Sequence, residues 1–224
     1  MILGILSDIH SNLWTLQDVL KENSRVDQWI CLGDFTGLLP MVNETINLLV
    51  NHKVICIRGD HETCLITNTV LKQSFSGTEA LVLQRQIVPK ETKKWIQALP
   101  IKRVLRFDKR TLLLTHNLTG SLIANKYIIN LKHLEQKYNT MDIVMFGHTH
   151  LPFYWEGKQT QLLNPGSLGF PVSKTKQGTY ATVDTETLHT EFHWIDVHPN
   201  DCIRSLENHI YPKRIIDIIQ HRML

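Results

Sequence analysis

Short apolar runs alternate with polar, glycine-containing loops along the first part of the chain. Residues 2–6, 29–32 and 54–57 are runs of this kind, and their length and apolar character predict buried strands. Between these runs, apolar residues recur at helical spacing over 13–22 and over 40–50. This alternation of strand, loop and helix predicts parallel strands that are covered by helices.

The middle of the chain continues with both kinds of pattern. Residues 63–99 are predicted to be mostly helical, and residues 101–107 and 110–115 are predicted to form a β-hairpin. Residues 130–138 have the spacing of a helix, and residues 143–146 form another apolar run that predicts a buried strand. The fold class is therefore α/β or α+β.

Segments with strand character dominate the chain from residue 153 to about residue 197. They suggest a second sheet, and they cover residues 153–155, 162–163, 180–183 and 191–197. After Pro199 the apolar residues return to helical spacing, which predicts a helical tail over about 199–224. Because no linker or low-complexity stretch divides the chain, we expect one domain that spans residues 1–224.

Composition and charge narrow the class of protein. The 224 residues are 42% hydrophobic and 20% charged, as in ordinary globular proteins. The net charge of +3, from 24 Lys and Arg against 21 Asp and Glu, is too small to indicate nucleic-acid binding by itself. The first apolar run ends at Asp8 and has no basic residue before it, so it is typical neither of a signal peptide nor of a membrane span.

The cysteines and the tail give two further expectations. None of the four cysteines forms a Cys-x-x-Cys pair, and Cys31 and Cys56 lie inside predicted strands. Reduced thiols and the lack of a signal peptide predict a cytoplasmic protein. In the tail, Ile215, Ile218 and Ile219 are expected to be core residues or contacts of a homodimer, and no membrane helix is expected there.

Candidate metal ligands follow five of the predicted strands. Loops at the carboxyl ends of the strands of an open sheet lie along one edge, so we expect these side chains to face one pocket. In an extended segment, residues i and i+2 point to the same side about 6.6–6.8 Å apart, so Asp8 with His10 and His148 with His150 are each expected to present two ligands together. The candidates are Asp8 with His10, Asp34, Asp60 with His61, His116, and His148 with His150.

The mixture of imidazole and carboxylate indicates the kind of ion. This mixture suits Mn, Fe, Zn, Co or Ni, whereas Ca and Mg prefer oxygen ligands alone. Taken singly, each motif has an ordinary explanation as a turn or as a hydrogen-bonded loop histidine. Taken together, they predict a site for two ions about 3.5–4 Å apart.

The order of these motifs resembles that of the calcineurin-like metallophosphoesterase superfamily, and in particular its small bacterial and archaeal phosphodiesterase branch. A short segment after the last motif, residues 164–167 (Asn-Pro-Gly-Ser), extends the resemblance. The resemblance implies a four-layer αββα sandwich, in which two mixed β-sheets are flanked by helices. The motifs here read Asp8-Ile9-His10, Gly33-Asp34, Gly59-Asp60-His61-Glu62, His116-Asn117 and Gly147-His148-Thr149-His150.

The same resemblance implies a role for each ligand. A hydroxide held between the two ions would attack phosphorus, and His61 would stabilise the transition state or protonate the leaving group. The alternative for His61 is a structural hydrogen bond in a tight loop. The implied first metal site is Asp8, His10 and His150, and the implied second site is Asp60, His116 and His148, with Asp34 bridging both.

Two residues depart from the family pattern. Asp60 stands where the family usually has a metal-ligating Asn, which lowers the formal charge of the loaded site by one unit. Such a site should hold metal more tightly and attract anionic phosphate less, so our hypothesis is that Asp60 favours diesters or shifts the metal preference. Asn117 stands where Gly is usual, and it is either a substrate contact or a solvent-facing turn residue.

The surroundings of the motifs leave alternatives open. Arg58 is a candidate substrate-binding residue that clamps a phosphate, or else it is a buried partner of a carboxylate. The basic residues between 102 and 110 are a solvated strand edge or a contact for a polyanion such as an oligonucleotide.

Together the residues and the resemblance predict a cytoplasmic, dinuclear metal-dependent phosphoesterase. We expect a phosphodiesterase that acts on a small or nucleotide-derived phosphodiester, with a nucleotide or an oligonucleotide among the candidate substrates. Two divalent transition-metal ions are the implied cofactors, with Mn²⁺ expected first and Fe, Zn, Ni or Co as alternatives. The competing predictions are a phosphomonoesterase or protein phosphatase, and a metal-binding scaffold that has lost turnover.

Overall fold

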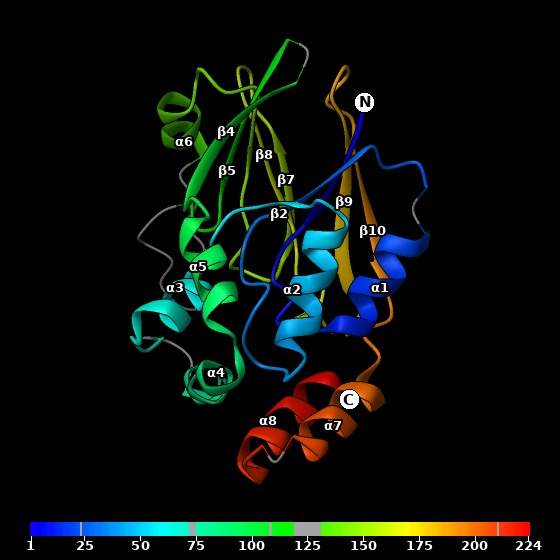
Figure 1. Ribbon diagram of the computed structural model, residues 1–224. Coiled ribbons are helices and arrows are strands. Elements are labelled where there is room, and N and C mark those ends of the chain that lie inside the picture. Colours follow the sequence, from blue (N-terminus) through cyan, green and yellow to red (C-terminus); the bar gives the residue numbers. More distant parts are fainter. Residues whose placement is uncertain (23, 72–74, 108, 119–130, 210) are drawn as a thin grey trace.

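The computed structural model describes residues 1–22, 24–71, 75–107, 109–118, 131–209 and 211–224. Two five-stranded sheets stand face to face, and helices lie on their outer sides and at one end (Figure 1). Residue 130 of the predicted helix and residue 108 of the predicted hairpin turn lie outside the described residues.

The first sheet has the strand order β10-β9-β1-β2-β3. Three parallel strands, β1 to β3, carry the apolar runs near the start of the chain, and β9 and β10 add to them in antiparallel fashion. The strands are β1 (Ile2–Leu6), β2 (Gln28–Cys31), β3 (Ile55–Cys56), β9 (Gly178–Asp184) and β10 (Thr190–Ile195).

The second sheet has the strand order β4-β5-β6-β8-β7. The hairpin of β4 and β5 is antiparallel, as predicted, and β6 and β8 continue the sheet parallel to β5. The strands are β4 (Lys102–Phe107), β5 (Arg110–Thr115), β6 (Ile143–Met145), β7 (Pro152–Glu156) and β8 (Gln161–Pro165).

The late strands do not form a sheet of their own, so that part of the prediction is wrong. β7 and β8 join the hairpin sheet, whereas β9 pairs with β1, with Gly4 opposite Thr182. Alternating hydrophobicity identifies a strand, but it does not say which distant strand will be its neighbour. The sequence pattern therefore did not predict that the strands after residue 150 are shared between the two sheets.

Three apolar layers hold the sheets and helices together. Between the sheets, Leu3 and Ile5 of β1 belong to one buried cluster with Leu112 and Leu114 of β5. On the outer face of the first sheet lie α1 (Leu13–Glu22) and α2 (Val42–Asn51), and on that of the second lies α6 (Leu131–Lys137). This is the four-layer αββα sandwich with two mixed sheets that the resemblance implied.

Three helices, α3 (Asp60–Thr67), α4 (Phe75–Ile87) and α5 (Lys90–Ala98), follow β3. Helix α3 begins at Asp60, inside the segment that was expected to be a loop, and Gly59 precedes it in extended conformation. Glu62 closes the helix start by accepting the backbone N–H of Gly59 at 2.9 Å. Asp60, His61 and Glu62 therefore share the first turn of a helix.

The chain ends in a helical hairpin of α7 (Pro199–Asn208) and α8 (Lys213–Met223). Its buried residues, which include Leu206, Ile215 and Ile219, pack in one cluster with Leu39 and Phe170. No helix in the described part of the chain is long and apolar enough to cross a membrane.

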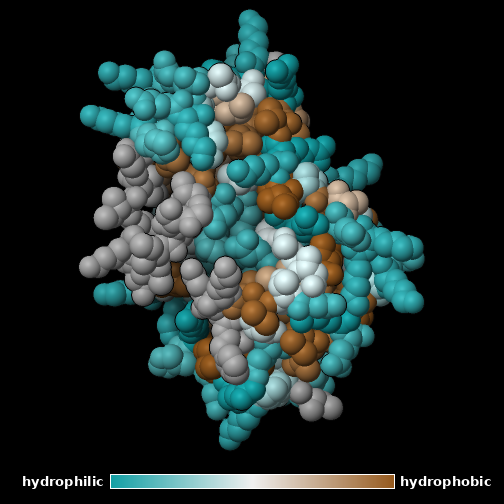
Figure 2. All heavy atoms as spheres, turned by 90° about the vertical axis from the view of Figure 1, so that its left-hand side faces the viewer, coloured by the Kyte–Doolittle hydropathy of each residue, from teal (hydrophilic) through white to brown (hydrophobic). Residues whose placement is uncertain are grey.

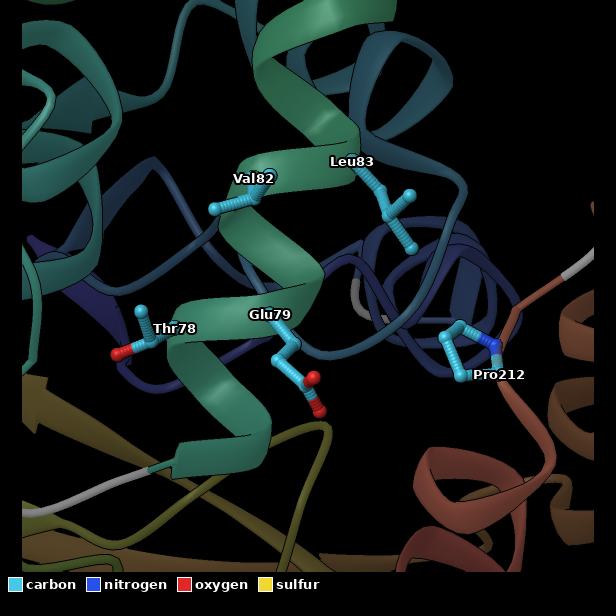
Figure 3. Close-up of a pocket in the computed structure, with 5 residues that line it drawn as sticks. All are labelled: Thr78, Glu79, Val82, Leu83 and Pro212. Atoms are coloured by element: carbon cyan, nitrogen blue, oxygen red, sulfur yellow. The ribbon is translucent and has the colours of Figure 1, made fainter.

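A pocket of about 280 Å³ lies between α4 and the turn ahead of α8 (Figure 3). It is lined by Thr78, Glu79, Val82, Leu83 and Pro212, and the carboxylate of Glu79 pairs with Arg214. The lining holds none of the candidate metal ligands. On the coloured part of the face in Figure 2, apolar residues lie in small groups among hydrophilic ones.

We predict that the hairpin is anchored by one face of α8. Ile219 is fully buried, and its neighbour Ile218 is 41% exposed. Ile219→Ala should lower the free energy of unfolding by about 2–5 kcal/mol because it leaves a cavity, whereas Ile218→Ala should change it by no more than about 0.5 kcal/mol. Urea denaturation measures both, and equal losses would contradict this packing.

Candidate metal centre

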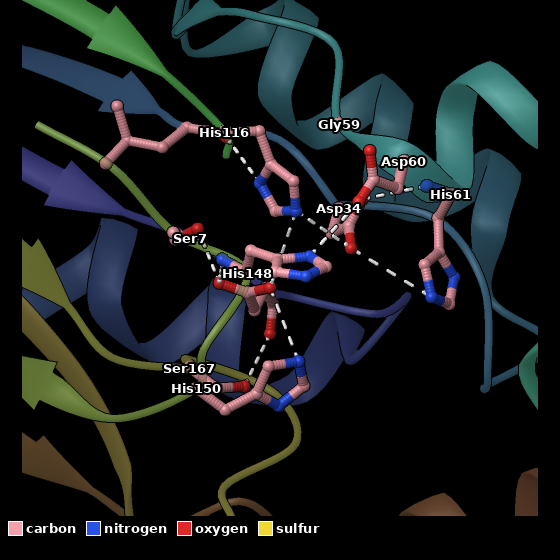
Figure 4. Close-up of polar contacts among 12 residues, drawn as sticks. Ser7, Asp34, Gly59, Asp60, His61, His116, His148, His150 and Ser167 are labelled. Atoms are coloured by element: carbon pink, nitrogen blue, oxygen red, sulfur yellow. Dashed lines mark hydrogen bonds and ion pairs between the residues drawn. The ribbon is translucent and has the colours of Figure 1, made fainter. Parts of the chain in front are cut away.

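The predicted ligands come together where β1, β2, β5 and β6 end, at the start of α3 (Figure 4). Both sheets contribute: Asp8 and Asp34 follow strands of the first sheet, and His116 and His148 follow strands of the second. The two sheets thus meet at one cluster of carboxylates and imidazoles.

The first group of ligand atoms is Asp8, His10 and His150, whose atoms lie within 4.8 Å of one another. Asp8 Oδ1 is 3.3 Å from His150 Nε2 and 4.0 Å from His10 Nε2. The two imidazole Nε2 atoms are 3.0 Å apart. One carboxylate oxygen and two ring nitrogens therefore face a common point.

The second group is Asp34, His116 and His148. Asp34 Oδ2 lies 3.1 Å from His116 Nε2, and the same nitrogen is 4.0 Å from Asp8 Oδ1 in the first group. Asp34 also belongs to a third group with His10 and His61. Asp34 thus stands between the two sides of the cluster.

Backbone carbonyls fix the tautomer that three ligand imidazoles adopt in their neutral form. The Nδ1 atoms of His10, His116 and His150 lie 3.2, 2.8 and 2.6 Å from the carbonyl oxygens of Thr36, Leu32 and Phe170, respectively. A carbonyl only accepts, so each Nδ1 must be the donor. In the neutral ring the lone pair is then on Nε2, which is the atom that faces the cluster.

The donor set fits bound cations. Asp8 Oδ1 and His116 Nε2 are buried, and the polar atoms beside them belong to other candidate ligands: His150 Nε2 lies 3.3 Å from the first and Asp34 Oδ2 lies 3.1 Å from the second. Burial disfavours the charged form of His116, but Asp34 and Asp8 outweigh it and hold the pKa of that imidazole well above its usual value. The carboxylates therefore favour positive charge at this point, which a divalent cation would supply.

The backbone at the ligands is not extended, so the expectation of paired i and i+2 ligands on one strand face is wrong in its geometry. Left-handed backbone turns the ligands toward the cluster instead, and such strain at non-glycine residues is typical of functional sites. The ligands with positive φ are Asp8 (52°), His10 (51°), Asp34 (51°), His148 (70°) and His150 (59°).

Asp60 is the most exposed of the predicted ligands, with 47% of its side chain accessible. Its Oδ2 lies 3.1 Å from His148 Nδ1, and this hydrogen bond lowers the pKa of the carboxyl group. Among the described residues, Asp60 belongs to none of the groups of three whose ligand atoms lie within 4.8 Å of one another. Its contact with the cluster is the hydrogen bond with His148.

The first turn of α3 aims His61 at Asp34. The backbone N–H of His61 donates to Asp34 Oδ1 at 2.9 Å, and its Nε2 is 3.9 Å from Asp34 Oδ2. On the other side, a Cβ at Gly37 would lie only 1.9 Å from His61 Nδ1. Gly37 also has φ of +87°, so both its conformation and the approach of His61 require glycine.

Glu62 is a positioning residue to which the motif alone gave no role. Its buried carboxylate accepts the backbone N–H groups of Asp34, Thr36 and Gly59 at 2.8–2.9 Å, and also the hydroxyl of Thr36. Burial, together with the charge of Asp34, raises the pKa of Glu62 to about 7. Glu62 therefore ties the loop that carries Asp34 to the start of α3.

Gln84 of α4 holds the same loop from the other side, and no sequence signal marked it. It is fully buried, its Oε1 accepts the N–H of Gly37 at 2.9 Å, and its Nε2 donates to the carbonyl of Leu39 at 2.6 Å. A polar residue inside a helical apolar pattern would have been the only available clue.

Residues 164–167 form hydrogen bonds with the loops that carry Asp8 and His148. Asn164 donates to the carbonyl of Gly147 at 2.9 Å, and the Ser167 hydroxyl donates to the carbonyl of Asp8 at 2.7 Å. The Ser167 oxygen also accepts the N–H of Phe170 at 2.9 Å. This network links the loops of His148, Asp8 and His150.

The two candidate substrate residues have contacts outside the cluster. Arg58 donates from Nη1 to the carbonyl of Gln97 at 3.3 Å, and its N–H donates to the carbonyl of Pro100. The carbonyl of Asn117 accepts the hydroxyl of Thr115 at 2.9 Å. Their roles toward substrate stay predictions.

A family model of the calcineurin-like phosphoesterase superfamily domain matches residues 1–188. The fold and the cluster together are those of a metal-dependent phosphoester hydrolase. The chain belongs to the calcineurin-like phosphoesterase superfamily.

Individual relatives come from bacteria and archaea, as expected for the small bacterial and archaeal branch that the motifs resemble. The chain is 29% identical over 201 residues to the phosphodiesterase YfcE of Escherichia coli, covering 84% of this chain and 90% of YfcE. It is 24% identical over 208 residues to the uncharacterised protein MJ0912 of Methanocaldococcus jannaschii, covering 85% of each. The crystal structure of a metallophosphoesterase from Sphaerobacter thermophilus shares the fold, with a TM-score of 0.79, 20% identity and full coverage of both chains.

We predict that Glu62→Gln loosens the loop of Asp34. The amide has nearly the same size, but its NH₂ group cannot accept a hydrogen bond, so at least one of the buried backbone N–H groups loses its acceptor and the free energy of unfolding should fall by about 1–3 kcal/mol. Glu91→Gln, at a carboxylate that is 82% exposed, is the matched control and should have little effect. Equal stability of the two variants in urea denaturation would refute the assigned role.

Proposed function

We propose that this chain is a phosphodiesterase that binds two divalent transition-metal ions, with Mn²⁺ as the expected metal. The observation that carries the proposal is the pair of adjacent ligand groups, with Asp34 between them. Asp8, His10 and His150 would hold one ion. Asp34, Asp60, His116 and His148 would hold the other, with Asp34 shared.

Residues of the chain prepare the site before substrate arrives. The carbonyls of Thr36, Leu32 and Phe170 orient three imidazoles, so their lone pairs need no rearrangement when the metals bind. When bound, the two cations would activate a water as the nucleophile and offset the negative charge of the phosphoryl oxygens.

His61 would act on the substrate rather than hold a metal. Its backbone is fixed by Asp34 and its ring is confined by Gly37, which leaves it rigid beside the ligand groups. From this place the imidazole would donate to a phosphoryl oxygen or give a proton to the leaving oxygen. Because His61 also lies within 4.8 Å of ligand atoms of His10 and Asp34, a role as a ligand is the alternative that the experiment below must separate.

Two observations favour a nucleotide-derived diester as substrate. Asp60 adds a carboxylate at the most exposed part of the cluster, and this charge would disfavour the dianion of a monoester more than the monoanion of a diester. Lys102 begins β4 opposite Thr115, the residue directly before His116, and its exposed side chain would attract a polyanion. YfcE, the relative from Escherichia coli, is itself named a phosphodiesterase.

Hydrolysis of an aryl phosphodiester in the presence of Mn²⁺ tests the proposal. His61→Ala should lower kcat by about 10²–10⁴-fold, while the purified variant still binds two equivalents of manganese. His52→Ala, at an exposed residue after α2, is the control and should retain activity. A wild-type protein that binds metal without turnover would favour a scaffold, and loss of one metal equivalent in His61→Ala would make His61 a ligand.

We predict that Asp60 sets the preference between diesters and monoesters. Asp60→Asn removes one negative charge at nearly constant size, so the ratio of diester to monoester kcat/KM should fall by about tenfold, which corresponds to about 1.4 kcal/mol. Turnover of matched aryl monoesters and diesters measures this ratio. An unchanged ratio, together with unchanged metal dependence, would refute the hypothesis.

A further inference from the structure

The last turn of α8 brings an arginine close to the metal centre. The guanidinium carbon of Arg222 lies over the ring of Phe170, 5.8 Å from its centre. Residue 222 lies beyond the part of the chain that the family model matches, which ends at residue 188. The helical hairpin therefore adds a cation that the family motifs do not contain.

Phe170 connects this arginine to the ligand imidazoles. Its ring centre lies 6.4 Å from that of His150 and 6.2 Å from that of His10, and its carbonyl holds the Nδ1 of His150. Phe170 is 3% exposed and packs in the cluster with Ile215 and Ile219 of α8. One buried ring thus lies against both Arg222 and the ligand imidazoles.

Arg222 is available to an anion. Its side chain is exposed, and among the described residues no carboxylate forms an ion pair with it. By contrast, Arg204 of α7 pairs with Asp201 and Arg214 of α8 pairs with Glu79. A guanidinium that stacks on an aromatic ring keeps its N–H groups free for bidentate binding of phosphate.

We propose that Arg222 binds a second phosphate of the substrate, next to the phosphodiester that is cleaved. This inference rests on the proposed function and narrows its substrate class to diesters that carry a further phosphate group. Arg222 stands one ring outside the ligand imidazoles. Because the ring of Phe170 lies against both the guanidinium and the ligand imidazoles, the inference assigns to Arg222 a phosphate other than the one that the imidazoles would hold.

Binding of two dinucleotides tests the proposal. Thymidylyl-thymidine and its 5′-phosphorylated form differ only by the second phosphate, and calorimetry gives their dissociation constants for the manganese-loaded His61→Ala chain, in which turnover is slow. The phosphorylated form should bind about tenfold more tightly. Arg222→Gln should abolish this preference, and Arg222→Lys, which keeps the charge but not the bidentate geometry, should retain part of it.

Arg204→Gln is the matched control, because it removes an exposed arginine from the same hairpin, and it should leave the preference unchanged. A preference that persists in Arg222→Gln, or that is absent from the parent chain, would overturn the inference. Hydrolysis of both dinucleotides by the wild-type protein is measured in parallel. If the wild type hydrolyses neither, the proposed function fails, while the ratio of dissociation constants still decides the role of Arg222.

Discussion

The structure depends on a concentration of carboxylates and imidazoles that have little else to bind. Asp8 Oδ1 and His116 Nε2 are buried and lie against other candidate ligands, His150 Nε2 and Asp34 Oδ2 respectively, and two imidazole nitrogens face each other at 3.0 Å. Burying several carboxylates and imidazoles together is costly, so the arrangement is favourable only when positive charge lies among them. The left-handed backbone at five of the predicted ligands adds to this cost, and the surrounding hydrogen bonds must offset it.

Those hydrogen bonds come from residues that do not face the metal centre themselves. Glu62 and Gln84 hold the loop between Asp34 and Leu39 from two sides, through three backbone N–H groups and one carbonyl of that loop, and Glu62 also accepts the N–H of Gly59. Ser167 holds the loop of Asp8, which follows a strand of the first sheet, and Asn164 holds the loop of His148, which follows a strand of the second. Because the strands behind these loops belong to two packed sheets, the ligands from both sheets are held by rigid elements.

The sequence predicted which side chains gather at one place better than it predicted the path of the chain. The spacing of the motifs and the family resemblance pointed to Asp, His and Gly residues after the strands, and six of these candidate ligands lie together in the structure, while their binding of metal stays a prediction. The pairing of β9 with β1 could not be predicted, because periodicity carries no information on distant partners. Gln84 and Phe170 also escaped notice, since each acts through a contact with a loop that is remote in sequence.

Anomalous diffraction from a crystal loaded with manganese tests the central claim most directly. The account predicts two peaks in the anomalous difference map, one among Asp8, His10 and His150 and the other among Asp34, His116 and His148. A single peak, or peaks bound by other residues while these imidazoles keep their present hydrogen bonds, would contradict it.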